Sequence, residues 1–261
     1  MSVREKSSVY EQPSVYNQGG GGSSFDVDIG GGISQTFVFP QYLQPVEYIS
    51  LENYTANNFS LLGCSQVQAA QDYYFKTKFS VNYNKMGNDY EVPFDFAPAY
   101  HHNDNHEIRI SVNYLKYIIV GFGSANIQFS SLDYDKTMIV EVDCPHNLFK
   151  LSYADGSNSF SRTDTRNKGT RNMGQWTFFN YFQTTAAQTF HGKIYYTYLK
   201  QGNSAKALWV PARSKDANDK KPYIVECVAG SVGVNCSENA SITGIEFGPD
   251  IDLSDIGNYF Q

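Results

Sequence analysis

The chain has 261 residues, of which 15 % are aromatic and 18 % charged, and its formal net charge at pH 7 is -6. A nucleic-acid or anionic-membrane partner requires a concentrated basic face, whereas the lysines and arginines here are scattered apart from the pair Lys220-Lys221 and residues 162–171, so we expect neither partner. No segment approaches the ~20 apolar residues of a membrane helix, which argues against membrane insertion.

The first 34 residues differ in texture from the rest of the chain. Ser-Val-Tyr, followed one residue later by Gln, occurs at Ser8–Gln12 and again at Ser14–Gln18, and four glycines, Gly19–Gly22, come after. Glycine loses the most backbone entropy on ordering, so we expect residues 1–34 to be an arm that takes shape only against a partner. An extended arm binds along a groove or sheet edge through alternate side chains. The residues predicted to anchor it are Val9, Tyr10, Pro13, Val15 and Tyr16.

Two further features bear on the cellular compartment. The charged N-terminus has no apolar stretch behind it, unlike a secretory signal, so we expect synthesis in the host cytoplasm. The four cysteines contain no Cys-x-x-Cys pair, which favours buried, reduced thiols over a zinc or redox motif. These cysteines are Cys64, Cys144, Cys227 and Cys236.

Residues 35–248 have the pattern of one β domain. Between Tyr73 and Tyr83 apolar and polar residues alternate, which predicts a half-buried strand. Short strand candidates separated by turn signals such as Asp155-Gly156 then follow one another, and such a succession is typical of a sandwich or jelly roll. The candidates are 106–114, 116–123, 125–131, 136–144, 147–153, 174–182, 192–202, 207–212, 221–229 and 241–247. Residues 249–261 are predicted to be an acidic surface tail.

Three stretches resemble the concanavalin A-like, laminin-G-type jelly rolls common in proteins of Bacteroidales and their phages. They are Val46–Tyr54, Met138–Ser157 and Phe190–Ser214, within a resemblance that covers about residues 40–248. In that family the last stretch is a Gly-Lys-Ile-Tyr-Tyr strand followed by a Val-Pro-Ala-Arg-type turn. The resemblance implies an all-β, two-sheet antiparallel jelly-roll sandwich with an extended N-terminal arm. The family's early Ser/Gly/Thr-rich turn is replaced by SLENYTANNFSLLGC, so no binding rim is transferred.

With its glycine-rich arm, the whole chain is similar to head-fibre or auxiliary capsid proteins of crAss-like tailed phages that infect Bacteroidales. This similarity implies a virion protein on the phage head surface, attached to the major capsid or another head protein. It further implies a homo-oligomer, a dimer or trimer, whose jelly roll binds host or mucosal glycans. Trp176 and Trp209 are the candidates for stacking on sugar rings, with buried core rings as the ordinary alternative. The other functions left open are a soluble carbohydrate-binding lectin and a glycosidase.

A glycosidase needs two carboxylates that flank the scissile bond. Glu141-Val142-Asp143 matches the first half of the Glu-x-Asp-x-x-Glu pattern of laminarinase-type glucanases, but 144–147 lacks the second glutamate. We therefore expect no enzyme and assign no catalytic residue.

Two kinds of segment contain residues that could bind a metal ion. His101, His102, Asp104 and His106 could supply imidazole and carboxylate ligands, although the segment reads as a solvated polar loop. Oxygen ligands for calcium could come from Asp155–Ser159 or Asp250–Asp252, which are also ordinary Asx turns. No cofactor is expected, and calcium is left open.

Overall fold

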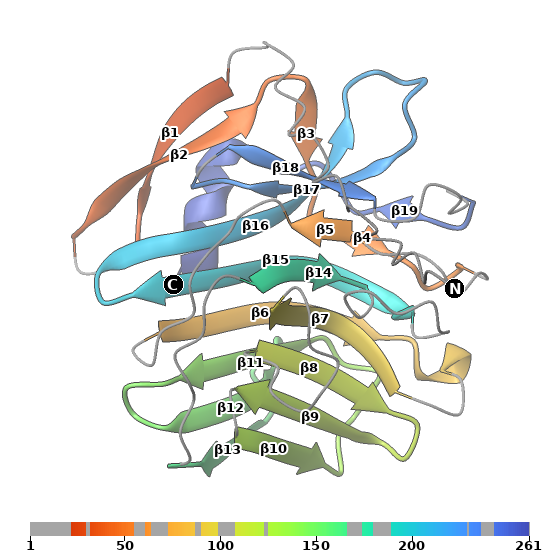
Figure 1. Cartoon of the computed structure of the whole chain (residues 1–261). Coiled ribbons are helices and arrows are strands. Elements are labelled where there is room, and N and C mark those ends of the chain that lie inside the picture. The colour runs from red at the N-terminus through yellow and green to blue at the C-terminus, as the bar shows by residue number, and fades with distance from the viewer. Residues whose placement is uncertain are drawn as a thin grey trace, which may run out of the picture.

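The structure is a computed structural model, shown in Figure 1. It describes residues 22–29, 32–54, 61–63, 73–86, 90–98, 108–122, 125–165, 174–179, 189–228, 230–235 and 243–260. Every strand pairing in these residues is antiparallel, as Phe/Tyr-rich alternating segments favour. Two short 3₁₀ helices, η1 (Tyr83–Lys85) and η2 (Leu253–Phe260), complete the described elements.

The first sheet runs in the order β13, β12, β11, β6, β15, β16, β17 and β18. Three short strands extend it, because β3 pairs with β16, and β4 pairs with both β15 and β19. The bounds are β3 (Leu43–Pro45), β4 (Ile49–Ser50), β6 (Tyr73–Val81), β11 (Met138–Asp143), β12 (Leu148–Tyr153), β13 (Ser159–Thr163), β15 (Gly192–Gln201), β16 (Ser204–Ser214), β17 (Pro222–Glu226), β18 (Ser231–Asn235) and β19 (Glu246–Phe247).

The second sheet runs in the order β10, β9, β8, β7, β14 and β5. Since β18 pairs with both β17 and β5, it joins the two sheets along one side. The prediction of an all-β antiparallel sandwich is confirmed by these pairings. The bounds are β5 (Leu61–Gly63), β7 (Tyr90–Pro98), β8 (Ile108–Asn113), β9 (Tyr117–Phe122), β10 (Ala125–Ser130) and β14 (Gly174–Phe178).

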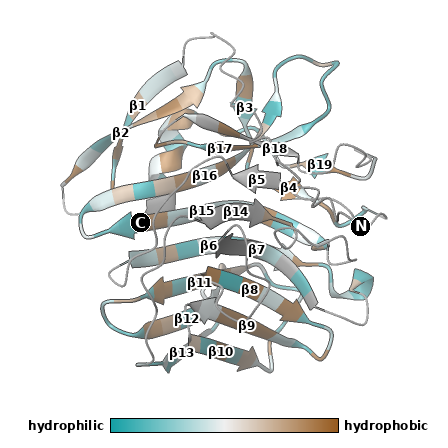
Figure 2. Cartoon of the chain, in the orientation of Figure 1, coloured by the Kyte–Doolittle hydropathy of each residue, from teal (hydrophilic) through white to brown (hydrophobic). Residues whose placement is uncertain are grey.

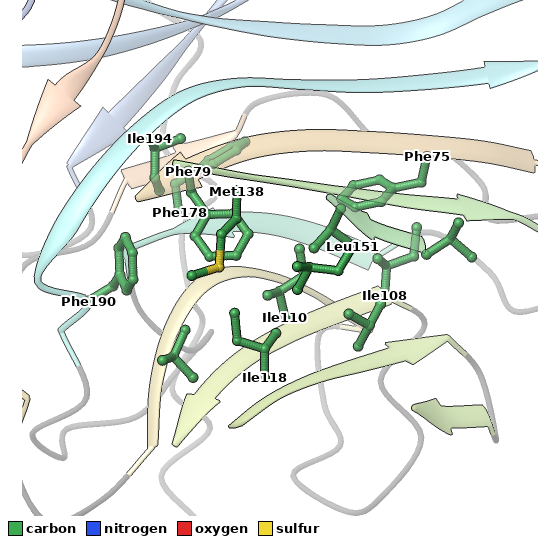
Figure 3. Close-up of a cluster of buried hydrophobic side chains, with 14 of the residues drawn as sticks. Phe75, Phe79, Ile108, Ile110, Ile118, Met138, Leu151, Phe178, Phe190 and Ile194 are labelled. Carbon is green, nitrogen blue, oxygen red and sulfur yellow. The ribbon is translucent and has the colours of Figure 1, made fainter. Parts of the chain in front are cut away.

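The main core fills the space between the two sheets. Figure 3 shows Phe75 and Phe79 of β6 and Met138 of β11 facing Ile108 and Ile110 of β8. All of these side chains are almost completely buried. At ~25 cal/mol per Å² of apolar surface removed from water, such burial is the main force that holds the sheets together.

The alternation predicted from Tyr73 onward is confirmed. Along β6 the residues alternate strictly between buried and half-buried as far as Val81, whereas Tyr83 lies in η1. Figure 2 shows apolar stretches on β8 and β9 and polar residues in the turns between strands. The predicted turn at Asp155-Gly156 joins β12 to β13, and Gly156 has a φ of 73°, which glycine adopts without steric cost.

A third layer covers the outer face of the first sheet over β15, β16 and β17. It consists of the hairpin β1 (Gly22–Asp28) and β2 (Ser34–Pro40) together with η2, seen beside β15 and β16 in Figure 1. Val27, Phe37 and Ile256 from this layer are buried with Tyr198 and Val210 in a second core. Strands β15 and β16 are therefore buried on both faces, which explains their nearly continuous apolar sequence.

Two domain boundaries differ from the sequence prediction. Residues 22–29 and 32–34, assigned to the arm, form most of the β1–β2 hairpin, in which Val27 and Ile29 are buried. Residues 253–260, assigned to a surface tail, form η2, which contacts β1 and buries Ile256. The glycines and acidic residues of these two segments led to the prediction that both lie at the surface. Their apolar side chains are buried because the two segments pack together in the third layer.

Two smaller expectations can also be compared. The Val-Pro-Ala-Arg segment, expected to be a turn, lies inside β16, where the Pro211 carbonyl accepts a hydrogen bond from Val46 at 3.0 Å. Cys144 and Cys227 are buried thiols as predicted, whereas Cys64 and Cys236 lie outside the described residues. In the part of the chain that the structure describes, no helix is long and apolar enough to span the bilayer.

Candidate functional site

A groove of about 770 Å³ lies at one end of the sandwich. Its walls are the end of β6 with η1, the turn between β8 and β9, the connection between β10 and β11, and the start of β15. Polar side chains dominate these walls. A groove of this volume lies within the range of small-ligand sites, ~300–1,000 Å³.

Two tyrosines form the aromatic wall of the groove. The rings of Tyr83 and Tyr134 lie 5.2 Å apart between centroids at an angle of 41°. The Tyr83 hydroxyl donates to the Tyr114 carbonyl, and the Lys116 Nζ lies 4.7 Å from the Tyr83 ring centroid. The Tyr83 ring is therefore held in place while its side chain remains half-exposed.

The hydroxyl of Tyr134 is the unusual polar group of this wall. It is buried, and it has no hydrogen-bond partner among the residues that the structure describes. Burial raises the pKa of Tyr134, and the nearby hydroxyls of Tyr83 and Tyr153 raise it further, so the hydroxyl keeps its proton. An unsatisfied buried hydroxyl costs free energy.

The sequence neighbours of these two tyrosines present exposed acceptors and donors. The side chains of Asn84, Asp133 and Asp135 are exposed. The connection that carries the two aspartates is fixed, because the Asp133 backbone N–H donates to the Tyr153 hydroxyl at 2.7 Å and Asp135 N–H donates to Asp133 Oδ1 at 3.1 Å. The side chains of Asp133 and Asp135 therefore project from a turn whose backbone is held by hydrogen bonds.

The groove carries charges of both signs. The Lys193 Nζ lies 3.2 Å from Glu52 Oε2 on one side, and Lys116 supplies a second ammonium on the other. Desolvation lowers the pKa of Lys193, but the Glu52 carboxylate outweighs it and the net pKa is raised. The site therefore offers ammonium, amide and carboxylate groups next to aromatic rings, which suits a ligand rich in hydroxyl groups.

Of the two tryptophans predicted to bind glycans, Trp209 does not line this groove. Trp209 is fully buried in the main core, 5.9 Å from the ring of Phe178, so the prediction that it stacks on a sugar is wrong for this conformation. Its inward position follows from the β16 alternation, in which Leu208 and Val210 face the second core. Trp176 lies in β14, but its side chain is outside what the structure describes.

The arm and histidine predictions fall on other parts of the chain. All five anchor residues, Val9, Tyr10, Pro13, Val15 and Tyr16, lie outside the described residues, so attachment to a phage head stays a prediction. The same holds for metal binding by His101, His102, Asp104 and His106. Within the described ranges, no group of three or more His, Cys, Asp or Glu residues is placed to hold a metal ion.

The carboxylates of the glucanase-like half motif are engaged by other side chains. Glu141 accepts a hydrogen bond from the Tyr74 hydroxyl and lies 2.9 Å from the Lys150 Nζ, and Asp143 lies 2.8 Å from His146. Burial acts to raise the pKa of Glu141, but Tyr74 and Lys150 outweigh it and the pKa falls below its ordinary value. A general acid needs the opposite shift.

The two candidate calcium turns are occupied by basic side chains. Asp155 forms an ion pair with Lys136, and its other oxygen accepts the Ser157 N–H at 2.9 Å. Arg213 donates to both oxygens of Asp250, at 2.9 and 2.6 Å. A calcium ion at either turn would have to displace a cation that already neutralises the carboxylate.

Sequence reasoning did not find the groove. The sequence pattern predicts a strand that reaches Tyr83, and it gives the segment Asp133-Tyr134-Asp135 between two strand candidates no functional role. An aromatic residue flanked by two aspartates between two strong strand patterns is the signal that could have marked this connection. Its meeting with η1 and Lys116 depends on the pairing of strands, which the sequence alone does not give.

No protein-family model matches the chain. No curated protein matches it either. Among solved structures, a native heptameric SAP-like pentraxin from Limulus polyphemus matches with a TM-score of 0.43 and 10 % identity, covering 60 % of this chain and 76 % of the pentraxin. The CBM40 of Ruminococcus gnavus IT-sialidase, solved with alpha2,3 sialyllactose, has a TM-score of 0.38 and 11 % identity and covers 54 % of this chain and 78 % of the CBM40.

The full extracellular region of zebrafish Gpr126/Adgrg6 matches with a TM-score of 0.44 and 10 % identity over 64 % of this chain. The chain spans only 22 % of that region's length. The assignment of this chain to the antiparallel sandwiches rests on its strand pairings and not on these distant likenesses.

Proposed function

We propose that the chain is a carbohydrate-binding module whose ligand lies in the groove between η1 and the connection from β10 to β11. The observation that carries the proposal is the position of the half-exposed Tyr83 next to exposed amide and carboxylate groups on the groove wall. A sugar ring has an apolar C–H face and a rim of hydroxyls that both donate and accept. Tyrosine suits the face, and Asn84, Asp133 and Asp135 suit the rim.

Two properties of the groove support binding without hydrolysis. Its carboxylates are exposed or paired with a lysine, whereas a general-acid carboxyl lies in an apolar pocket. Its walls come from separate elements whose backbone positions are fixed by strand pairing and by the bonds to Tyr153 and Tyr114. A fixed polar wall binds with little ordering cost.

A glycan array probed with the full chain tests this proposal. The double variant Asn84→Ala/Asp135→Ala removes two exposed polar groups from the groove, and we expect it to lose the signal of every glycan that the unchanged chain binds. Asn203→Ala/Asp255→Ala is the matched control, because both residues are exposed, neither lines the groove, and the charge change is the same. Equal binding by both double variants, or no glycan bound by the unchanged chain, would reject the proposal.

A further inference from the structure

One face of the first sheet carries an unexpected concentration of lysines. Because side chains alternate along β6, Tyr74, Lys76, Lys78 and Ser80 all lie on its outward side, and successive members are about 7 Å apart. The neighbouring strands add lysines on the same side: in the strand register, Lys193 of β15 lies opposite Ser80 and Lys200 lies opposite Tyr74.

The same face of the sheet continues from β6 onto its neighbours β11 and β12. Glu141 lies opposite Lys76, and Lys150 of β12 lies opposite Glu141. We call the five lysines on this face, Lys76, Lys78, Lys150, Lys193 and Lys200, the lysine row. Four carboxylates, Glu52, Glu141, Asp143 and Glu246, accompany the lysine row among the described residues, so the five lysines outnumber them by one although the whole chain carries -6.

Tyrosines hold several of these ammonium groups without neutralising them. The Lys78 Nζ lies 4.4 Å from the Tyr195 ring centroid, and the Lys200 Nζ lies 5.0 Å from that of Tyr74. A tyrosine face attracts a cation but leaves its charge available to an anion. Burial, and then the nearby ammoniums of Lys150 and Lys200, lower the pKa of Lys76 against the opposing effect of Glu141, so like charges are crowded here.

The lysine row is continuous with the groove. Ser80, Lys193 and Tyr195 line the groove and also lie at the start of the lysine row. No described residue of β11 or β12 belongs to the second core, so the third layer does not cover the part of the lysine row on these two strands. Tyr74, Lys76, Lys78 and Ser80 are only half-buried, so a chain-like ligand seated in the groove can continue along the outward side of β6.

We propose that the ligand is an acidic oligosaccharide, bearing carboxylate or sulfate groups, which extends from the groove along β6 so that its anionic groups meet the lysine row. This inference rests on the proposed carbohydrate-binding function and specifies its ligand class. The interspersed Glu141 and Asp143, and a row made of lysines without arginine, argue against a nucleic acid, whose closely spaced phosphates favour dense basic surfaces and arginine forks.

The test measures binding of the full chain to four probes: oligogalacturonate, dextran sulfate, uncharged dextran and a 20-nucleotide deoxythymidine strand. The variant Lys76→Gln/Lys78→Gln removes two charges from the lysine row. Lys220→Gln/Lys221→Gln removes the same charge from an exposed loop and is the control. We expect the first variant to weaken binding of one or both acidic glycans by about tenfold, the loop variant to change it less than twofold, and Asn84→Ala/Asp135→Ala to weaken it as well.

The carboxylated and sulfated probes identify which anionic group is recognised. Equal losses in the two lysine variants would show long-range attraction only and overturn the proposal. Uncharged dextran bound as tightly as the acidic glycans would overturn the inference and leave the proposed function standing. Acidic glycans that bind independently of Asn84 and Asp135 would overturn both, and tighter binding of the deoxythymidine strand would overturn the choice of a glycan. Circular dichroism and thermal unfolding confirm that each variant is folded.

Discussion

His191 and Glu91 form a buried pair that links the two sheets of the sandwich. The His191 Nδ1 lies 2.8 Å from Glu91 Oε1, and the His191 backbone N–H donates to Glu91 Oε2 at 2.8 Å. Glu91 belongs to β7 of the second sheet, and His191 immediately precedes β15 of the first. Both residues are almost fully buried, at 4 % and 7 % exposure.

Removal of one partner of this pair leaves a buried polar group unsatisfied. We expect His191→Ala to lower the free energy of unfolding by about 3–5 kcal/mol, measured by urea denaturation at neutral pH. The chain supplies a matched control, because His146 and Asp143 form a second histidine–carboxylate pair at 2.8 Å with the histidine side chain 77 % exposed. His146→Ala should cost less than about 1 kcal/mol. Similar costs for the two variants would show that the buried pair does not tie the sheets together.

The ion pair of Glu141 should make stability depend on pH. Because the pKa of Glu141 is held below its ordinary value in the folded chain, its stabilising contribution is complete above pH 4.5 and disappears as the pH falls through the folded-state value. We expect Glu141→Gln to be less stable than the unchanged chain at pH 7, and the difference to shrink on acidification below pH 4.5. Urea denaturation at pH 7, 5, 4 and 3 measures this, and a difference that does not change with pH would contradict it.

The third layer should contribute to the stability of the whole domain. Ile256 of η2 is fully buried against the hairpin and the outer face of the first sheet, so we expect Ile256→Ala to cost about 2–5 kcal/mol in urea denaturation. Leu115→Ala is the control, because that side chain is 61 % exposed and its loss should cost within about 0.5 kcal/mol. If Ile256→Ala is as mild as Leu115→Ala, the C-terminal segment is a surface tail, as its sequence had indicated.

Two cysteines should be inert in the folded protein. Burial, with a smaller effect from Glu226, raises the pKa of the fully buried Cys227, and Cys144 is also buried. Thiols that stay protonated and covered react slowly with alkylating reagents. We expect peptide mapping after iodoacetamide treatment to find both cysteines unmodified in the native chain and modified in 8 M urea. Modification of either one under native conditions would place it at the surface.

The sandwich could be predicted because its strands carry strong local patterns. On β6 the alternation of Phe75, Lys76, Thr77 and Lys78 assigns each side chain to a face without knowledge of its neighbours. The third layer could not be predicted in this way. Val27 and Ile256 belong to short apolar series, Phe25-Val27-Ile29 and Ile251-Leu253-Ile256, that lie in glycine-rich and acidic surroundings, and their burial depends on long-range contacts with β15 and β16.

The same distinction separates the predicted site residues from the observed groove. Trp209 was chosen for its residue type, but its side chain points into the core because of its position in the β16 alternation. The groove residues Tyr83, Lys116 and Tyr134 come from three separate connections, and only the strand order brings them together. The basic surface was missed for a similar reason, since lysines of β6, β12 and β15 are distant in sequence and adjacent only in the sheet.

The central claim is that a sugar occupies the groove between η1 and the connection from β10 to β11. The most direct measurement is a two-dimensional amide NMR titration of the full chain with the glycan that gives the strongest array signal. The account predicts that the largest shifts occur at residues 82–84, 116 and 133–135, with saturation at a single affinity. Shifts that cluster at another surface, or spectra unchanged at millimolar glycan, would contradict it.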